Sequence, residues 1–328
     1  MLRMPPFEVH TPRTAAEAVQ RKTELPGSLY VAGGTDLLPN LKHWLHTPPH
    51  LISLADCTEL VGVTPASDGA LRIGAGTTLH AVASDPTITA SLPGLASAVQ
   101  QIAGPQHRRM GTLGGNVMLD TRCLFYNQTR DWREALGYCL KKDGSWCHVI
   151  GSAKACVAAQ SSDSVPMLVA LDASIEAALP DGSTATVALS DLYTKDGRFL
   201  QNHTLHPDAL VTAITVPAPA EGHRSIYRKV RSRAAIDYPQ LSIALVGAFD
   251  GPTCTALQIV IGAMLPFPKP ITGVDLAVGT PLDDATIDAV AERAFKQARP
   301  QTQLHSQPDW RRHLARVEVT RGLRALRG

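Results

Sequence analysis

Four of the six cysteines lie in one polar segment, where their thiolates could hold a metal. They are Cys123, Cys139, Cys147 and Cys156, and their spacing is C-x15-C-x7-C-x8-C. Thiols stay reduced in the cytoplasm, so a cluster of this kind in a cytoplasmic chain predicts a metal site rather than disulfides. The spacing matches neither the zinc-finger pattern nor the ferredoxin patterns, and it therefore does not identify the metal by itself.

Two soft-ligand sites suit this quartet: a structural zinc ion and a [4Fe–4S] cluster. Zinc usually takes cysteines in closely spaced pairs, which this segment lacks, so we favour the cluster and keep zinc as the alternative. A third interpretation, unmetallated core thiols, conflicts with the many charged residues of the segment. His148 is not expected to be a ligand, because four cysteines already fill the site. The isolated Cys57 and Cys254 are expected to be small buried hydrophobic residues.

The charges of the segment could serve a cluster as well. Basic residues outnumber acidic ones, and a [4Fe–4S] centre with four thiolates carries negative charge that they would partly offset. An exposed basic surface here would also favour docking of an acidic ferredoxin. A solvated loop is the plainer alternative. The basic residues are Arg130, Arg133, Lys141, Lys142 and Lys154, and the acidic ones are Asp131, Glu134 and Asp143.

Two glycine loops could bind phosphate. One is AGGTDLL, which follows an apolar strand, and the other is GTLGGN. Glycine lets the main chain turn tightly and bring its N–H groups close to an anion. Neither loop fits G-x-G-x-x-G or the G-x-x-x-x-G-K-[ST] phosphate loop, so a Rossmann domain and an ordinary NTPase are disfavoured. Together the loops are predicted to cradle a pyrophosphate, through Ala32, Gly33, Gly34, Thr35, Asp36, Leu37, Leu38, Gly111, Thr112, Leu113, Gly114, Gly115 and Asn116.

Composition predicts a globular cytoplasmic chain of two or three domains. It has 328 residues, 44% of them hydrophobic, and a formal net charge of +2. Basic residues are scattered, so we expect no nucleic-acid partner. No signal peptide begins the chain and no apolar run of about 18 residues occurs, so no membrane contact is expected.

Hydrophobic periodicity predicts α+β elements around these loops. Thr14 and Glu17 form a capping box before an amphipathic helix, and the flanking strands make a βαβ-like unit over residues 1–60. ALRIGAGTTLHAV predicts a strand, a glycine turn and a helix start, and LPGLASAVQQIAG an apolar-faced helix. VPMLVALDASIEAAL, ATVALSDLY and ALVTAITVP are predicted to be β-rich. Beyond Pro217 and Pro219, three strands and then two helices predict an α+β domain.

Several motifs, in order, resemble one family: AGGTDLL, IAGPQHRRMGTLGGN, SDSVPMLVALDA, IYRKVRSRAAIDYPQLSIAL and HSQPDWRRHLARVEVTRGL. The chain is similar over nearly its whole length to the FAD-binding medium subunits of the molybdenum hydroxylases, the relatives of xanthine dehydrogenase and carbon monoxide dehydrogenase. The resemblance implies a two-subdomain FAD-binding fold of the vanillyl-alcohol-oxidase (PCMH) type over residues 1–219, divided near residue 60. It also implies a C-terminal α+β domain over 220–328, like that of the CO dehydrogenase flavoprotein.

The same resemblance assigns roles to individual residues. Ala32 to Leu38 would wrap the pyrophosphate of FAD, and Thr112 to Asn116 would close over it. Asp163 would contact the nucleotide portion, and Lys229 would lie near the isoalloxazine. The plainer alternatives are an N-cap for Asp163 and a solvated strand-end charge for Lys229. No acid, base or nucleophile is expected to be catalytic in this chain.

The cysteines lie in an insertion relative to the family pattern, in which GGN is followed within about ten residues by Ser-x-Asp. Here 47 positions separate Asn116 from Asp163, so residues 118–160 are inserted. In this feature the chain resembles the 4-hydroxybenzoyl-CoA reductase branch. That resemblance implies a heterotrimer, itself dimerised, with the molybdenum cofactor on a large subunit and [2Fe–2S] clusters on a small one. Electrons would pass from ferredoxin to [4Fe–4S], to FAD, and then to the partner centres. A stand-alone FAD oxidoreductase, or a flavoprotein subunit with a zinc loop, is the alternative.

Overall fold

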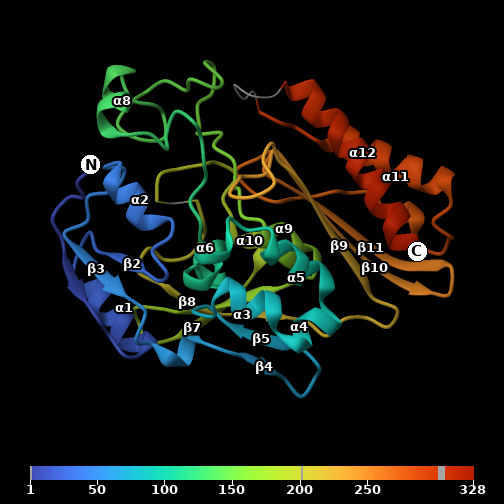
Figure 1. The fold of residues 1–328 in the computed structure, drawn as a ribbon, viewed down its shortest axis with the longest axis horizontal. Coiled ribbons are helices and arrows are strands. Elements are labelled where there is room, and N and C mark those ends of the chain that lie inside the picture. Colours follow the sequence, from blue (N-terminus) through green and yellow to red (C-terminus); the bar gives the residue numbers. More distant parts are fainter. Residues whose placement is uncertain (1, 201, 302–306) are drawn as a thin grey trace.

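Three β-sheets organise the chain, which is described here as a computed structural model covering residues 2–200, 202–301 and 307–328. In Figure 1 the first sheet lies at the left, the second below the centre and the third at the right. Each sheet carries its own helices, and the four-cysteine segment lies at the top, above the first sheet. None of the helices in the described part of the chain combines the length and apolarity needed to cross a bilayer.

The first sheet is parallel, in the order β1-β3-β2. Its strands are β1 (Glu8–His10), β2 (Leu29–Val31) and β3 (His50–Ser53), joined by α1 (Ala15–Glu24) and α2 (Leu37–Lys42). The predicted βαβ-like unit is therefore confirmed. Thr14 caps α1 by accepting a hydrogen bond from the Glu17 amide at 3.1 Å, whereas the Glu17 carboxylate accepts from the Arg13 amide instead of completing the capping box.

The second sheet is antiparallel, in the order β4-β5-β8-β6-β7. Its apolar side chains pack against short helices on one face, and α1 packs on the other. The strands are β4 (Val63–Pro65), β5 (Leu71–Gly74), β6 (Ser174–Ala178), β7 (Thr184–Ala188) and β8 (Leu210–Val216). The helices are α3 (Leu79–Ser84), α4 (Pro86–Ser91), α5 (Pro93–Gln100), α6 (Pro105–Met110), α7 (Leu113–Val117), α9 (Ser164–Ala170) and α10 (Leu189–Leu192), with a 3-10 turn at Thr58–Leu60.

Two β-rich predictions are wrong in part. In ATVALSDLY the strand β7 ends at Ala188 and LSDL forms helix α10. VPMLVAL lies in helix α9, and a strand, β6, begins only at Ser174. Every residue of α9 is buried, because it packs against α5 on one side and against β10 and β11 of the third sheet on the other. A short, wholly apolar run has no periodicity that separates a buried helix from a buried strand, so tertiary packing decided the outcome.

The third sheet is antiparallel, in the order β12-β11-β10-β9, and two long helices cover one face of it (Figure 1). This confirms the predicted C-terminal strands and helices. Arg311 is fully buried and donates hydrogen bonds to the carbonyls of Gln240, Ala263 and Gln301, which ties α12 to the sheet. The elements are β9 (Arg224–Val230), β10 (Leu241–Asp250), β11 (Thr253–Gly262), β12 (Lys269–Pro270), a 3-10 turn (Asp275–Ala277), α11 (Asp284–Gln297) and α12 (Pro308–Arg327). His305 and Ser306, which begin the closing motif, lie outside the described residues.

The four-cysteine segment is mostly irregular. Its one described helix is α8 (Arg130–Ala135), and turns make up most of the remainder. Arg122 and Ala159 exchange backbone hydrogen bonds of 2.8 and 3.0 Å, which closes the segment at its base. A small cluster of Leu45, Tyr126 and Cys139 anchors it to the end of the first subdomain.

Candidate functional site

The two glycine loops meet, as their shared chemistry predicts. A Cβ atom added to Gly33 would lie 1.8 Å from the carbonyl oxygen of Met110, the residue just before the second loop. No side chain fits there, so the contact requires glycine. A Cβ on Gly111 would in turn lie 3.2 Å from the hydroxyl oxygen of Thr35 in the first loop. Main chain therefore lies directly against main chain, which suits a cradle for an anion.

The second loop is pinned to the turn after β5. The Leu113 amide donates to the Thr77 carbonyl at 2.9 Å, and the Gly114 amide donates to the Ala75 carbonyl at 2.8 Å. The Thr112 hydroxyl accepts from the Gly115 amide and caps α7. These hydrogen bonds occupy backbone amides of the second loop whose partners could not be predicted from the sequence. They hold the second loop beside the first one.

The Asn116 side chain is hydrogen-bonded to other residues of the fold. It is buried, and its side-chain oxygen accepts hydrogen bonds from the hydroxyls of Ser162 and Ser164, at 2.6 and 2.7 Å. The end of the second loop is thereby tied to the start of α9. These hydrogen bonds join the two ends of the stretch 118–160 that the sequence predicts to be inserted.

Asp163 and Lys229 form a buried pair with each other. The Lys229 ammonium lies 2.7 Å from one carboxylate oxygen of Asp163, and the Tyr227 hydroxyl donates to the other at 2.6 Å. Lys229 also donates to the Gln101 carbonyl at 3.0 Å. The solvated-charge alternative for Lys229 is wrong, because its side chain is 1% exposed. Asp163 does occupy the N-cap position of α9, but its side chain makes no capping hydrogen bond.

Burial acts on both members of this pair. It raises the pKa of Asp163, while Lys229 and Tyr227 oppose the shift by stabilising the carboxylate. It also lowers the pKa of Lys229, against the attraction of Asp163. A buried pair of this kind depends on both partners, because either charge alone would be left uncompensated in a low-dielectric surrounding.

Arg122 connects the glycine cradle to the cysteines, and no motif had singled it out. Its guanidinium forms an ion pair with Asp36 in the first glycine loop and lies 4.5 Å from the ring centroid of Tyr238. The next residue is Cys123. One signal in the sequence indicated a role for Arg122, its position next to the predicted ligand Cys123. Its partner Asp36 is remote in the sequence and could not be inferred.

The four cysteines of the segment converge on one cavity, lined by Cys123, Cys139, Cys147 and Cys156 with Tyr126 and Lys141 among their neighbours. All four are free thiols. Within the part of the chain that the structure describes, no three of these sulfurs lie within 4.8 Å of one another. Zinc–sulfur bonds of about 2.3 Å in a tetrahedron would bring the sulfurs to about 3.8 Å from one another. The quartet is thus wider than the arrangement around a single zinc ion.

The thiols are held in an apolar setting. Burial raises the pKa of Cys123, and it raises that of Cys156 to about 11. Cys139 and Cys147 are buried. Metal binding must therefore displace protons from these groups, as it does at thiolate sites generally.

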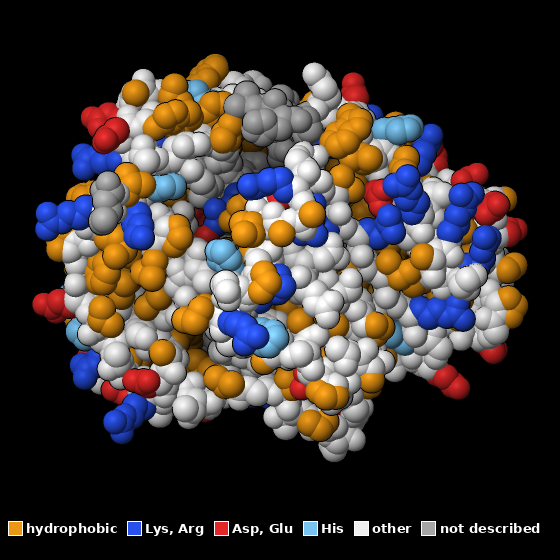
Figure 2. All heavy atoms as spheres, viewed as in Figure 1, with side chains coloured by type: hydrophobic (Ala, Val, Ile, Leu, Met, Phe, Trp, Pro, Cys, Tyr) orange, Lys and Arg blue, Asp and Glu red, His pale blue; other side chains and the backbone are white. Residues whose placement is uncertain are grey.

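The predicted exposed basic surface is only partly present. Arg133 and Lys141 are buried: Arg133 donates to the Trp44 carbonyl, and the Lys141 ammonium contacts Asp120, Thr121 and the Gly197 carbonyl at 2.6 to 2.8 Å. Both cations thus hold the segment together. In the upper left of Figure 2, apolar side chains are exposed among the charged ones over this segment. Those exposed beyond a third are Leu124, Trp132, Leu136 and Trp146.

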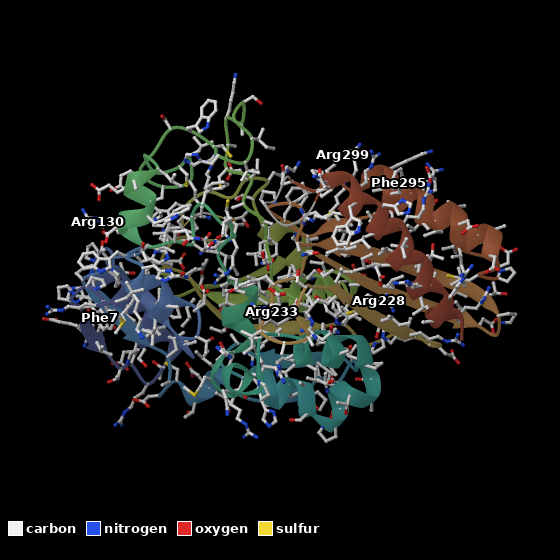
Figure 3. All side chains as sticks on the ribbon, turned by 45° about the horizontal axis from the view of Figure 1, so that its top comes forward. Phe7, Arg130, Arg228, Arg233, Phe295 and Arg299 are labelled. Atoms are coloured by element: carbon white, nitrogen blue, oxygen red, sulfur yellow. The ribbon has the colours of Figure 1, made fainter. Side chains whose placement is uncertain are left out.

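His148, Cys57, Cys254 and Arg130 lie outside the quartet, and the structure gives each of them contacts of its own. The His148 ring lies 2.6 Å from the Tyr138 carbonyl through Nε2 and stacks on Phe125. Cys57 and Cys254 are buried, and each thiol donates to a carbonyl. The prediction that these two are small buried residues is confirmed. Arg130, labelled in Figure 3, points from α8 toward the first subdomain, where its guanidinium lies 5.9 Å from the ring centroid of Trp44.

Two family descriptions cover almost the whole chain. Residues 5–219 match the FAD binding domain in molybdopterin dehydrogenase, and residues 225–326 match the CO dehydrogenase flavoprotein C-terminal domain. Together with the sheets and helices described above, these matches confirm the predicted fold class.

Known proteins show the same relationship. The chain is 35% identical to the aldehyde oxidoreductase FAD-binding subunit PaoB of Escherichia coli (strain K12), over 76% of this chain and 79% of that protein. It is 28% identical to the carbon monoxide dehydrogenase medium chain of Afipia carboxidovorans, over 97% and 95%. A solved structure of reconstituted CO dehydrogenase from Oligotropha carboxidovorans superposes with a TM-score of 0.81 at 27% identity, covering 99% of each chain. The chain belongs to the FAD-binding medium subunits of the molybdenum hydroxylase and CO dehydrogenase family.

Proposed function

We propose that this chain is the electron-transfer subunit of a molybdenum enzyme and that it carries both FAD and a [4Fe–4S] cluster. Its partners are a large subunit with the molybdenum cofactor and a small subunit with [2Fe–2S] clusters, in a heterotrimer that dimerises in the cytoplasm. The substrate reacts on the large subunit. This chain contributes no catalytic acid, base or nucleophile.

The glycine cradle supports the placement of FAD. Gly33 brings the first loop against the backbone before Gly111, where no larger residue fits. We assign the pyrophosphate to the first loop, Ala32 to Leu38, with the second loop, Gly111 to Asn116, closing over it. Asp163 would lie toward the nucleotide portion and Lys229 toward the isoalloxazine. Because Asp163 and Lys229 are bound to each other, we assign them the role of shaping the floor of the site.

The wide spacing of the four sulfurs is the observation that carries the proposal. Three of them cannot meet around one ion without moving, yet all four line the same cavity. A [4Fe–4S] cluster takes four cysteine thiolates on a larger frame. The alternative of a structural zinc loop would require the sulfurs to draw together.

The two sites are suited to work in series. Flavin exchanges electrons singly or in pairs, so it can connect one-electron clusters to a two-electron reaction, and the protein supplies placement. In this chain Arg122 would help to place the two sites relative to each other, because it lies next to Cys123 and forms an ion pair with Asp36 of the cradle. An electron carrier such as ferredoxin would dock at the exposed part of the segment, where Trp132 and Trp146 are accessible.

For the substrate, the inserted cysteine loop favours 4-hydroxybenzoyl-CoA. Two electrons and two protons would convert it to benzoyl-CoA and water in anaerobic aromatic degradation, with reduced ferredoxin as the donor. In that direction electrons enter at the [4Fe–4S] cluster and leave through FAD.

Aldehyde oxidation is a second candidate, favoured by the 35% identity to the FAD-binding subunit of an aldehyde oxidoreductase. Electrons would then flow the opposite way, from the partner centres toward this chain. Assaying the intact complex with an aldehyde and an artificial acceptor, and with 4-hydroxybenzoyl-CoA and reduced ferredoxin, distinguishes the two.

The decisive experiment measures iron, sulfide, zinc and flavin in the anaerobically purified complex, with and without Cys139→Ser. We expect the variant to contain about four fewer irons and sulfides per chain and to retain FAD. Loss of one zinc with unchanged iron would exclude the cluster and support the zinc loop. Absence of flavin from the unmodified complex would overturn the whole proposal, including the stand-alone oxidoreductase alternative.

A further inference from the structure

Three side chains with metal-binding atoms converge at the outer edge of the first sheet, away from the glycine cradle and the cysteines. Glu8 and His10 lie on β1, and His50 begins β3. The parallel register pairs Glu8 directly with His50, and His10 follows two residues later on the same face. Phe7, labelled at the left of Figure 3, precedes Glu8 and locates this edge.

The separations of the three groups fit one small cation. His10 Nε2 lies 3.2 Å from His50 Nδ1, and His50 Nδ1 lies 3.5 Å from Glu8 Oε2. All three ligand atoms lie within 4.8 Å of one another. Tetrahedral zinc with bonds of about 2.0 to 2.2 Å to nitrogen and oxygen places its ligand atoms about 3.3 to 3.6 Å apart. The separations of 3.2 and 3.5 Å are close to that range without any movement of the backbone.

The donors and their exposure suit a transition metal. Two imidazoles and one carboxylate are a ligand set that zinc and neighbouring divalent ions accept. The His50 side chain is 24% exposed and that of Glu8 is 76% exposed, so an ion can reach the site from solvent and keep a water ligand. Among the described residues, this is the one group of three or more such side chains whose ligand atoms are this close together.

We propose that Glu8, His10 and His50 bind a divalent transition-metal ion of the zinc type, with the remaining position open to water. The ion would clamp β1 to β3. β1 is a three-residue strand at the edge of its sheet, and its Val9 side chain is 56% exposed, so few other contacts hold it. The site is independent of FAD and of the cysteine quartet.

The competing explanation is a hydrogen bond between the two imidazoles, with Glu8 accepting from one of them. Titration of the purified complex with Co²⁺ separates the two. Visible d–d bands report nitrogen and oxygen ligation, and thiolate charge-transfer bands report any binding at cysteines. The variants are Glu8→Gln, His10→Gln and His50→Gln, with the exposed His80→Gln as the matched control.

We expect wild type and His80→Gln to bind one Co²⁺ without thiolate bands, displaceable by Zn²⁺. Each ligand variant should bind about tenfold or more weakly. Zn²⁺ should raise the thermal midpoint of wild type but not of His50→Gln. The proposal is overturned if wild type shows only thiolate-type bands, or if His10→Gln and His50→Gln bind as tightly as wild type. Unfolding midpoints without metal check that all variants fold.

Discussion

The glycine cradle, formed by the two glycine loops, and the four-cysteine segment are held in place by different kinds of contact. The cradle is made of main chain: Gly33 lies against Met110, and Gly114 is hydrogen-bonded to Ala75. Its parts contact each other directly. The segment has one described short helix, and its four cysteines line a shared cavity in which no three sulfurs lie within 4.8 Å of one another. A metal centre would cross-link the segment, whereas main-chain contacts and hydrogen bonds hold the cradle together.

Because of this difference, closure of the cradle does not depend on the four-cysteine segment. Ser162 and Ser164 bind Asn116 directly, so the cradle remains closed whatever lies between them. The cysteines therefore lie outside the contacts that close the cradle. Breaking each region separately tests whether the two are as independent as these contacts indicate.

Gly33→Ala should have the largest effect on the cradle. Its Cβ would lie 1.8 Å from a backbone oxygen, so the two loops must separate. We expect loss of FAD from the purified complex, measured by flavin release and absorbance, while the iron content of the segment persists. Gly182→Ala is the control for a glycine substitution remote from the cradle. Its left-handed φ of 82° strains the turn locally, but nothing lies within 4 Å of the added Cβ, so FAD should be retained. Retention of flavin by Gly33→Ala would place the cofactor elsewhere.

Cys139→Ser should have the reciprocal effect. Cys139 lies in the small cluster with Leu45 and Tyr126, so its loss removes a predicted ligand from the anchored side of the segment. We expect the paramagnetic signal of the cluster to disappear, FAD to remain, and ferredoxin-linked turnover to fall more than reoxidation of the reduced enzyme. The buried Cys57→Ser serves as control. Joint loss of both cofactors would mean that the segment and the cradle fold as one unit.

Lys229→Met should destabilise the protein by about 3–5 kcal/mol, because it leaves Asp163 buried without its cation. Chemical unfolding of the complex measures the loss. The double change Asp163→Asn with Lys229→Met should recover part of it, since no buried charge then lacks a partner. If FAD affinity falls in the single variant while stability does not, the pair touches the flavin rather than supporting the fold.

Acid should weaken the region around the cysteines before it weakens the cradle. His46 stacks on Phe199 beside the segment; burial, followed by Lys142, Lys141 and Arg133, lowers the pKa of His46 to about 4. The unfolded chain takes up this proton near pH 6.5, whereas the folded chain does not until about pH 4. Stability is therefore complete above pH 6.5 and falls by about 3 kcal/mol as the pH drops to about 4.

His46→Phe should remove this part of the pH dependence while preserving the ring contact. Unfolding midpoints of wild type and variant at pH 7 and pH 5 provide the comparison. Equal losses in both proteins would show that other groups cause the acid sensitivity.

Arg122→Gln should have the smallest effect, on the link between the two regions. The ion pair with Asp36 is partly solvated, with side chains 18% and 34% exposed, so its loss should cost about 1 kcal/mol. We expect FAD to bind about fivefold more weakly and electron exchange between cluster and flavin to slow, with the cluster signal intact. The exposed Arg109→Gln is the control. An unchanged exchange rate would show that Arg122 does not position the two sites.

Much of the fold was predictable because its signals are local. Thr14 marks the start of α1, alternating residues mark β6, an apolar run marks β8, and the glycines of the first loop mark a turn after β2. The motif order then indicated the family, since several weak signals in sequence are stronger than any one. The strand prediction for VPMLVAL was wrong, because a fully apolar run indicates that a segment is buried but not whether it is a helix or a strand.

By itself the sequence determined that two glycine loops and a cysteine quartet exist, and that they belong to a flavoprotein of this family. Only the tertiary structure decided that Asp163 pairs with Lys229, that Arg122 reaches Asp36, and that His10 meets His50. It also decided that Arg133 and Lys141 are buried. These contacts join residues distant along the chain, for example 66 positions for Asp163 and Lys229. Such pairings follow from how the sheets pack, and no local periodicity encodes that packing.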